Sequence, residues 1–218
     1  MLKKEAYWLG EIIYRYDSSM VFPMLNVGSS TEEFRTRTQP WIDRYVFAPA
    51  REKGLKVVHT DMKAAPGVDI VGDLFSAETA TNLASMQFKS VLCSNLLEHV
   101  EDRQRISTLL ESLVPPSGYI IVSCPYRYPY HPDPIDTGYR PTPEEIALLF
   151  TQSRLVSGHI LDCGIYLERL IHDPLLLIKL LARLLVPFYK PAMWWETIRV
   201  QTWLFRTVRV SCAVLQKL

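Results

Sequence analysis

A glycine and an acidic residue, each placed after an apolar run, are the first residues of this sequence that could bind a ligand. Gly28 follows the run FPMLNV and lets the backbone turn sharply and approach a ligand closely. Asp61 follows the run KVVHT, and a carboxylate at a strand end can accept hydrogen bonds from both hydroxyls of a ribose. The pair predicts a nucleotide-type ligand, and one glycine-bearing turn does not specify which.

Two histidines could take a proton from a substrate. His99 lies just after the apolar run SVLCS, and His131 lies in the loop 126–141. We predict that either one serves as a general base and that the loop binds the substrate. The predicted substrate-binding residues are Tyr130, His131, Asp133, Tyr139 and Arg140. The alternative is that His99 and the loop are purely structural, with Asp136 paired to Arg140.

Strands and helices alternate along the chain, and these elements must position the candidate residues. Val, Ile and Leu fill the predicted strands with little alternation, as in parallel strands covered on both faces. Strands are predicted at 22–27, 56–60, 68–71, 89–93, 119–124 and 208–216, and helices at 3–16, 102–113 and 142–150. The stretch 36–47 is predicted to form an irregular loop around Pro40, with a later helix. This order indicates an α/β fold whose strand C-terminal ends share one ligand-binding edge.

The composition is that of an ordinary globular protein, with 48% hydrophobic and 22% charged residues among 218. This length suits one domain, and a formal net charge of +1 gives no electrostatic basis for nucleic acid as the main partner. The cysteines lie far apart, without a C-x-x-C pair or a histidine at metal-ligand spacing: Cys93, Cys124, Cys163 and Cys212. We therefore expect no metal site, reduced thiols and a cytoplasmic location.

Two segments carry a family resemblance. The segment VLCSNLLEHVED, residues 91–102, and the turn LVPPSGY, residues 113–119, resemble class I S-adenosylmethionine-dependent methyltransferases of the small-molecule and envelope-biosynthesis type. The resemblance covers roughly residues 22–160. It implies S-adenosylmethionine as the cofactor and a small-molecule, glycan or lipid-linked acceptor of the methyl group. The implied fold is Rossmann-like, with a mostly parallel seven-stranded sheet and helices on both faces.

The resemblance also implies which residues hold the cofactor. The stretch 26–31 is similar to the family's glycine-rich turn, and 59–62 and 68–74 are similar to the ends of its second and third strands. Asp61 would then take the ribose hydroxyls, and Asp73 the amine of adenine. The full predicted set is Asn26, Gly28, Ser29, Ser30, Asp61, Met62, Gly72, Asp73, Leu74, Ser94, Asn95 and His99.

The glycine-rich turn departs from the family's pattern. Gly28 is its one remaining glycine, and Asn26 stands at the usual acidic position. Ser29 and Ser30 bring side chains into a turn that usually has none, so they either supply hydroxyl donors or weaken the cofactor site. Asp61 follows Gly28 by 33 positions, against about 20 in a compact dinucleotide-binding unit. A catalytically weakened binding or scaffolding protein is thus the alternative function, and a nicotinamide dehydrogenase is the other α/β class.

The segment 165–206 is predicted to be a hydrophobic helical insertion before the last strand of a single domain, 1–218. Its Leu-rich part, 175–188, is too short and too charged for a transmembrane helix. One interpretation is a helix that packs on the sheet or forms a homodimer contact. The other is an interfacial helix that docks on the inner face of a membrane.

Overall fold

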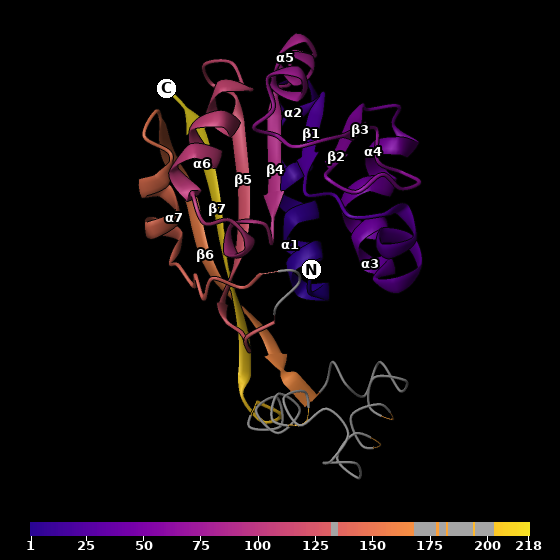
Figure 1. Ribbon diagram of the computed structural model, residues 1–218, viewed down its shortest axis with the longest axis vertical. Coiled ribbons are helices and arrows are strands. Elements are labelled where there is room, and N and C mark those ends of the chain that lie inside the picture. Colours follow the sequence, from indigo (N-terminus) through magenta and orange to yellow (C-terminus); the bar gives the residue numbers. More distant parts are fainter. Residues whose placement is uncertain (132–134, 168–177, 179–181, 183–193, 195–202) are drawn as a thin grey trace.

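Seven strands form one sheet in the order β3-β2-β1-β4-β5-β7-β6 (Figure 1). The computed structural model describes residues 1–131, 135–167, 178, 182, 194 and 203–218. The neighbours from β3 to β5 pair in parallel, whereas β7 runs antiparallel between β5 and β6. The predicted mostly parallel sheet is confirmed. The strands are β1 (Met24–Val27), β2 (Val57–Asp61), β3 (Ile70–Val71), β4 (Ser90–Ser94), β5 (Tyr119–Arg127), β6 (Ser153–Ile165) and β7 (Thr207–Lys217).

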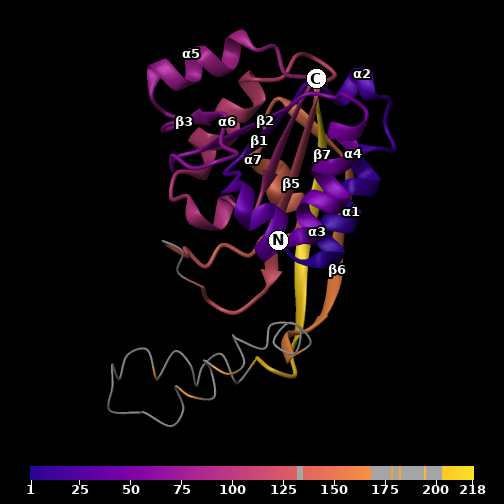
Figure 2. The ribbon, with the colours of Figure 1, turned by 90° about the vertical axis from the view of Figure 1, so that its right-hand side faces the viewer.

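Helices cover both faces of the sheet, as predicted (Figure 2). One layer holds α1 (Lys3–Ile13), α2 (Ser18–Val21), α3 (Pro40–Ile42) and α4 (Ala48–Glu52), and the other holds α5 (Ala77–Ser85), α6 (Arg103–Ser112) and α7 (Pro143–Leu149). Each layer has its own apolar core. Leu9 and Ile42 pack with Leu92 on one face, while Leu83 and Leu110 belong to the core on the other. Burial on both faces explains why the central strands β1, β4 and β5 are largely apolar.

Local sequence signals account for the two helices that follow β4 and β5. The Asp102 side chain accepts a hydrogen bond from the Arg105 amide and caps α6. Thr142 and Glu145 form a capping box at the start of α7, next to a proline at its first turn. These caps satisfy backbone N–H groups that a helix leaves unpaired, so both predicted helices form close to their expected bounds.

The irregular loop predicted around Pro40 is wrong, because the chain is already helical there; only the later part of this stretch was expected to be a helix. Two π-helical segments, Phe34–Thr38 and Asp43–Phe47, flank α3 and continue into α4. Ile42 is buried against the core beneath α1, so tertiary packing of an apolar face stabilises these short turns. Pro40 starts α3 at a position where a missing N–H costs nothing.

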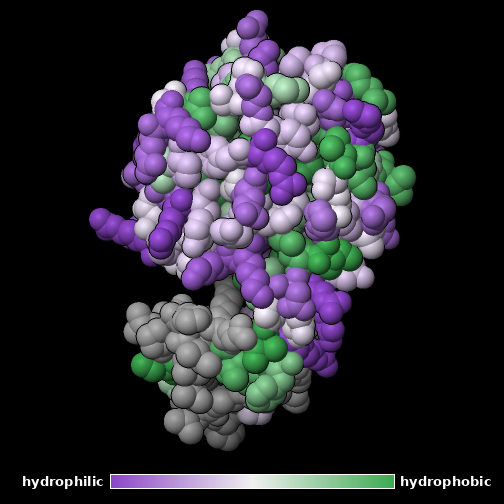
Figure 3. Space-filling model, turned by 180° about the vertical axis from the view of Figure 1, so that it is seen from behind, coloured by the Kyte–Doolittle hydropathy of each residue, from purple (hydrophilic) through white to green (hydrophobic). Residues whose placement is uncertain are grey.

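The last two strands extend past the ends of the parallel strands and form an arm on the body (Figure 1). Most of the predicted insertion 165–206 lies outside the described residues, as does its Leu-rich part apart from two positions. Among the described residues, no helix has the length and apolar character needed to cross a membrane. Seen from behind, hydrophilic side chains cover much of the described body, with hydrophobic ones in smaller groups (Figure 3).

Candidate functional site

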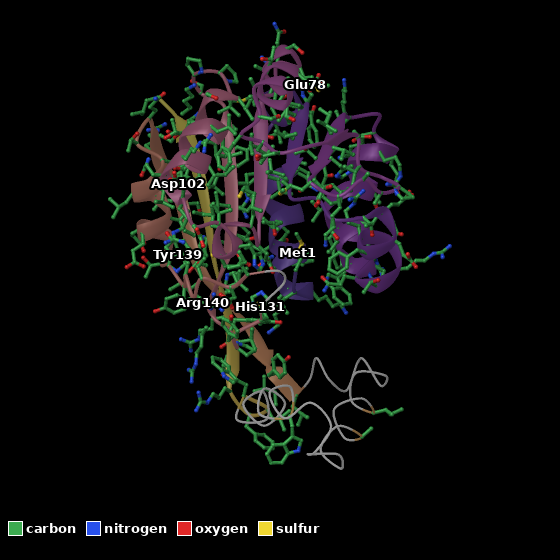
Figure 4. The ribbon with its side chains drawn as sticks, in the orientation of Figure 1. Met1, Glu78, Asp102, His131, Tyr139 and Arg140 are labelled. Carbon is green, nitrogen blue, oxygen red and sulfur yellow. The ribbon has the colours of Figure 1, made fainter. Side chains whose placement is uncertain are left out.

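A cavity of about 810 Å³ lies at the C-terminal ends of the parallel strands. Its wall combines residues from α1, from the β1 turn, from the ends of β2 and β4, and from the loop after β5. Met1 and His131 both line it, and they lie at the same end of the sheet, opposite Glu78 (Figure 4). This is the edge at which open α/β sheets bind ligands, so the cavity is the candidate site.

The fold brings all of the predicted cofactor-binding residues to the wall of this cavity, from Asn26 at β1 to His99 after β4. The two predicted general bases, His99 and His131, also line it. Tyr130, Tyr139 and Arg140 are not among the described residues of the wall, and Asp133 lies outside the described residues.

The turn after β1 is held by Asp61 and Arg35. Asp61 Oδ2 accepts a hydrogen bond of 2.8 Å from the Ser30 amide, and its Oδ1 accepts one from the Lys63 amide. The buried Arg35 guanidinium donates to the carbonyls of Ser29, Ser30 and Gly67 at 2.6–2.9 Å. The Ser29 hydroxyl donates to the Ser30 carbonyl, so this hydroxyl stabilises the turn from within. Arg35 organises the site and was missed from the sequence.

Gly28 and Gly72 are needed for steric reasons. Gly28 has φ +63°, and a Cβ on it would stand 3.2 Å from Leu96 Cδ1. A Cβ on Gly72 would stand 2.5 Å from Thr79 Oγ1. The absence of a side chain at Gly72 therefore allows the end of β3 to lie close to α5. Beyond Gly72, Asp73 Oδ1 accepts a hydrogen bond from the Phe75 amide, so one carboxylate oxygen already shapes the turn. Met62 is largely exposed at the rim, at 74%.

Glu5 of α1 is a central polar residue of the cavity wall, and sequence reasoning missed it. Its carboxylate is buried and accepts hydrogen bonds from the side chains of Ser94, Asn95 and Ser123 and from the Leu2 amide. Glu5 thus ties the N-terminal helix to the end of β4 and to the middle of β5. The available signal was an acidic residue in the first turn of an otherwise apolar helical face.

The ionisable side chains of Glu98, His99 and His131 lie close together near Glu5. His99 Nε2 lies 3.8 Å from Glu98 Oε1, and the rings of His99 and His131 lie edge to face with centroids 5.4 Å apart. Burial raises the pKa of Glu98 to about 7 and lowers the pKa of His131 below its usual value. His131 is therefore uncharged at neutral pH and can accept a proton.

The loop after β5 is ordered by an ion pair. Arg140 holds Asp136 through two hydrogen bonds of 3.0 and 2.6 Å, as the structural alternative for this pair predicted. Burial by itself would raise the pKa of Asp136, but Arg140 and the backbone amides of His131 and Gly138 hold it well below its usual value. Tyr139 packs against the core beneath the Arg103 guanidinium. Arg140 thus positions His131 through Asp136, whose Oδ2 accepts a hydrogen bond from the His131 amide.

Comparison with solved structures identifies the fold as that of the class I S-adenosylmethionine-dependent methyltransferases. The sequence matches no protein-family model and no curated protein. Coclaurine N-methyltransferase bound to N-methylheliamine and SAH is similar with a TM-score of 0.60 and 13% identity, over 99% of this chain and 70% of that one. The [4+2]-cyclase SpnF is similar with a TM-score of 0.55 and 13% identity, over 98% and 81%.

Phosphoethanolamine N-methyltransferase 2 of Haemonchus contortus, in complex with S-adenosyl-L-methionine, is also similar. Its TM-score is 0.52 at 11% identity, over 98% of this chain and 52% of that one. The likeness to these three proteins is one of fold. The three named proteins include a cyclase as well as methyltransferases, so the fold by itself does not define the reaction.

Proposed function

We propose that the chain binds S-adenosylmethionine in the cavity at the sheet edge and transfers its methyl group to a small-molecule, glycan or lipid-linked acceptor. The observation that carries this proposal is the convergence of the predicted cofactor residues and two histidines on one wall. The cavity volume of about 810 Å³ lies within the usual range for cofactor pockets, about 300–1,000 Å³.

The residues present fit this cofactor. Asp61 uses two amide donors, and a carboxylate has about four lone-pair positions, so it retains capacity for the ribose hydroxyls. Gly28 leaves the turn open for close approach of the ligand. Asp73 keeps one oxygen for the adenine amine, with Leu74 beside it on the wall. Asn95 and Ser94 remain our candidates for holding the methionine part.

The chain's own contribution is orientation and proton removal. When bound, the cofactor would supply a methyl carbon that its sulfonium group already activates. This carbon would bond to the acceptor's lone pair, and the electron pair of the broken carbon–sulfur bond would stay on sulfur. An acceptor hydroxyl must also lose its proton, and an imidazole nitrogen of His131 or His99 is the group that would take it. The His131 ring is oriented by Asp136, whose Oδ2 lies 3.2 Å from its Nδ1.

Calorimetric titration of the full chain with S-adenosylmethionine tests the proposal. We expect one site, with affinity reduced at least tenfold by Asp61→Ala and unchanged by Glu52→Ala, an exposed acidic residue outside the cavity. Absence of heat and of a thermal shift at millimolar cofactor contradicts the proposal. An unchanged affinity in Asp61→Ala removes Asp61 from the site.

The second candidate function is binding without methyl transfer. It is favoured by the turn at Ser29 and Ser30, where side chains replace the glycines and Ser30 itself has φ +55°. A protein that binds S-adenosylmethionine but releases no S-adenosylhomocysteine with any of a panel of hydroxyl and amine acceptors supports this second function.

A further inference from the structure

We propose that Glu98, His99 and His131 form a binding site for a divalent transition-metal ion at the cavity wall. One ligand atom from each residue lies within 4.8 Å of the others. Two imidazoles and one carboxylate are a ligand set that binds zinc, manganese, iron(II) or cobalt(II) with coordination positions left open. The proposal goes beyond methyl transfer and does not depend on it.

The Glu98 carboxylate points to a missing partner. Its side chain is fully buried, and Oε1 has no hydrogen-bond partner among the described residues. Its other oxygen, Oε2, is contacted by the Cys124 thiol at 3.6 Å. A buried carboxylate oxygen without a partner is costly, and such an atom in a folded protein calls for an explanation. A cation between Glu98 and His99 would supply the absent partner.

His99 is oriented as a ligand. Its Nδ1 hydrogen-bonds to the Ile135 carbonyl and must therefore carry the proton. Its Nε2 is then the nitrogen available to a metal ion, and it lies 3.8 Å from Glu98 Oε1. Metal-binding histidines commonly use their other ring nitrogen in this way, to bond a backbone carbonyl that fixes the tautomer and the ring plane.

The Nδ1 atom of His131 is also held by an acceptor, in this case mainly a carboxylate. Its Nδ1 lies 3.2 Å from Asp136 Oδ2 and 3.3 Å from the Pro129 carbonyl, and both of these oxygens are acceptors. The proton is thus on Nδ1, and Nε2 is left for a ligand. Arg140 holds Asp136 in turn, so the orienting carboxylate is itself fixed.

A small movement of the side chains would bring all three ligand atoms to coordination distance of one metal ion. Two ligands that lie about 2.1 Å from a zinc ion are at most ~4.2 Å apart, and the Glu98–His99 pair already satisfies this limit. No two of the three ligand atoms lie more than 4.8 Å apart, so the shift required is about an ångström or less by that estimate. His131 can provide it, because its side chain is 33% exposed and lies on a loop.

The open coordination positions would face the cavity, because His99 and His131 both line it. An acceptor that carries an oxygen ligand, such as a hydroxyl, carboxylate or phosphate, is the class of molecule that would complete the site. A metal-bound hydroxyl ionises more readily, which would remove the need for a histidine base. The two histidines lie 32 positions apart in the sequence, so rules based on the spacing of metal ligands do not detect this site. The sequence therefore predicts no metal.

Cobalt(II) titration of the full chain, after dialysis against a chelator and without S-adenosylmethionine, tests the site. Visible ligand-field absorption should rise and saturate at one equivalent when nitrogen and carboxylate ligands replace water. His99→Gln, His131→Gln and Glu98→Gln should each weaken cobalt binding at least tenfold. His159→Gln is the matched control, because this exposed histidine lies outside the cavity and should leave the titration unchanged.

Circular dichroism of each variant checks folding, and His131→Gln, in a loop, is the variant least able to disturb the core. The proposal is overturned if the wild-type protein shows no saturable absorption, or if His99→Gln and His131→Gln titrate like wild type. Either result leaves a metal-free Glu98–His99–His131 proton network in its place. Since the cofactor is absent from the measurement, failure here and failure of cofactor binding are distinguished.

Discussion

The side-chain amide of Asn26 donates a hydrogen bond to His59 Nδ1 across the β1–β2 pair, at 3.0 Å. An amide N–H can bond this nitrogen only when it is unprotonated, so the contact favours neutral His59. Burial and the Arg35 charge act in the same direction, and the pKa of His59 falls to about 4. Asn26 stands at the position that is usually acidic in the family that the sequence resembles. It therefore stabilises the uncharged form of His59 in the β1–β2 pair.

This contact predicts a pH dependence of stability. The folded-state pKa of about 4 lies below the unfolded value of 6.5, so the stability linked to neutral His59 is complete above pH 6.5 and is lost as pH falls toward 4. We expect the free energy of unfolding to fall less between pH 7 and pH 4.5 in His59→Asn, whose amide oxygen can still accept from Asn26. Urea unfolding measures this slope, and His159→Asn should retain the wild-type one.

Glu5 predicts a large local effect on stability. Glu5→Ala removes the buried carboxylate that accepts from the side chains of Ser94, Asn95 and Ser123, and we expect a loss on the order of 3 kcal/mol. Glu5→Gln retains an acceptor oxygen and should cost less. Chemical unfolding measures both. Glu11→Ala, an exposed residue of the same helix, is the control, and an equal loss in this variant would contradict a specific role for Glu5.

Much of the fold follows from local signals in the sequence. The apolar strands predict a covered parallel sheet, and the Thr142–Glu145 capping box predicts the start of α7. Strand C-terminal ends share one edge by topology, so Asp61 and Ser94 could be assigned to the same cavity before the structure was known. The predicted cofactor residues all line one cavity for that reason.

Contacts between distant parts of the chain were not visible in the sequence. Glu5, in the N-terminal helix, contacts residues at the end of β4 and in the middle of β5. Arg35 contacts the turn after β1, and no local pattern around Arg35 indicates this contact. The expected loop there became helical because Ile42 and Phe47 pack into the core, and packing overrides weak local preference. The pairing of His99 with His131 likewise depends on the loop conformation set by Asp136 and Arg140.

Replacing Arg35 should weaken cofactor binding more than it affects the rest of the fold. Arg35→Met removes the donors that hold the Ser29, Ser30 and Gly67 carbonyls, so the turn loosens and S-adenosylmethionine should bind at least tenfold more weakly. Calorimetric titration measures this loss. Arg37→Met, an exposed arginine two positions further on, should bind like wild type; a similar loss in both variants would show that Arg35 is not specific.

Gly28 and Gly54 allow backbone strain to be separated from cofactor binding. Both glycines have a left-handed φ, +63° and +65°, so either alanine variant should lose about 1–2 kcal/mol of stability. At Gly28 the new methyl group also meets Leu96 Cδ1 on the cavity wall, whereas nothing lies within 4 Å of a Cβ at Gly54. Gly28→Ala should therefore abolish or strongly weaken S-adenosylmethionine binding, while Gly54→Ala should bind normally at a temperature where both are folded. Equal affinities in the two variants would show that the turn at Gly28 does not contact the cofactor.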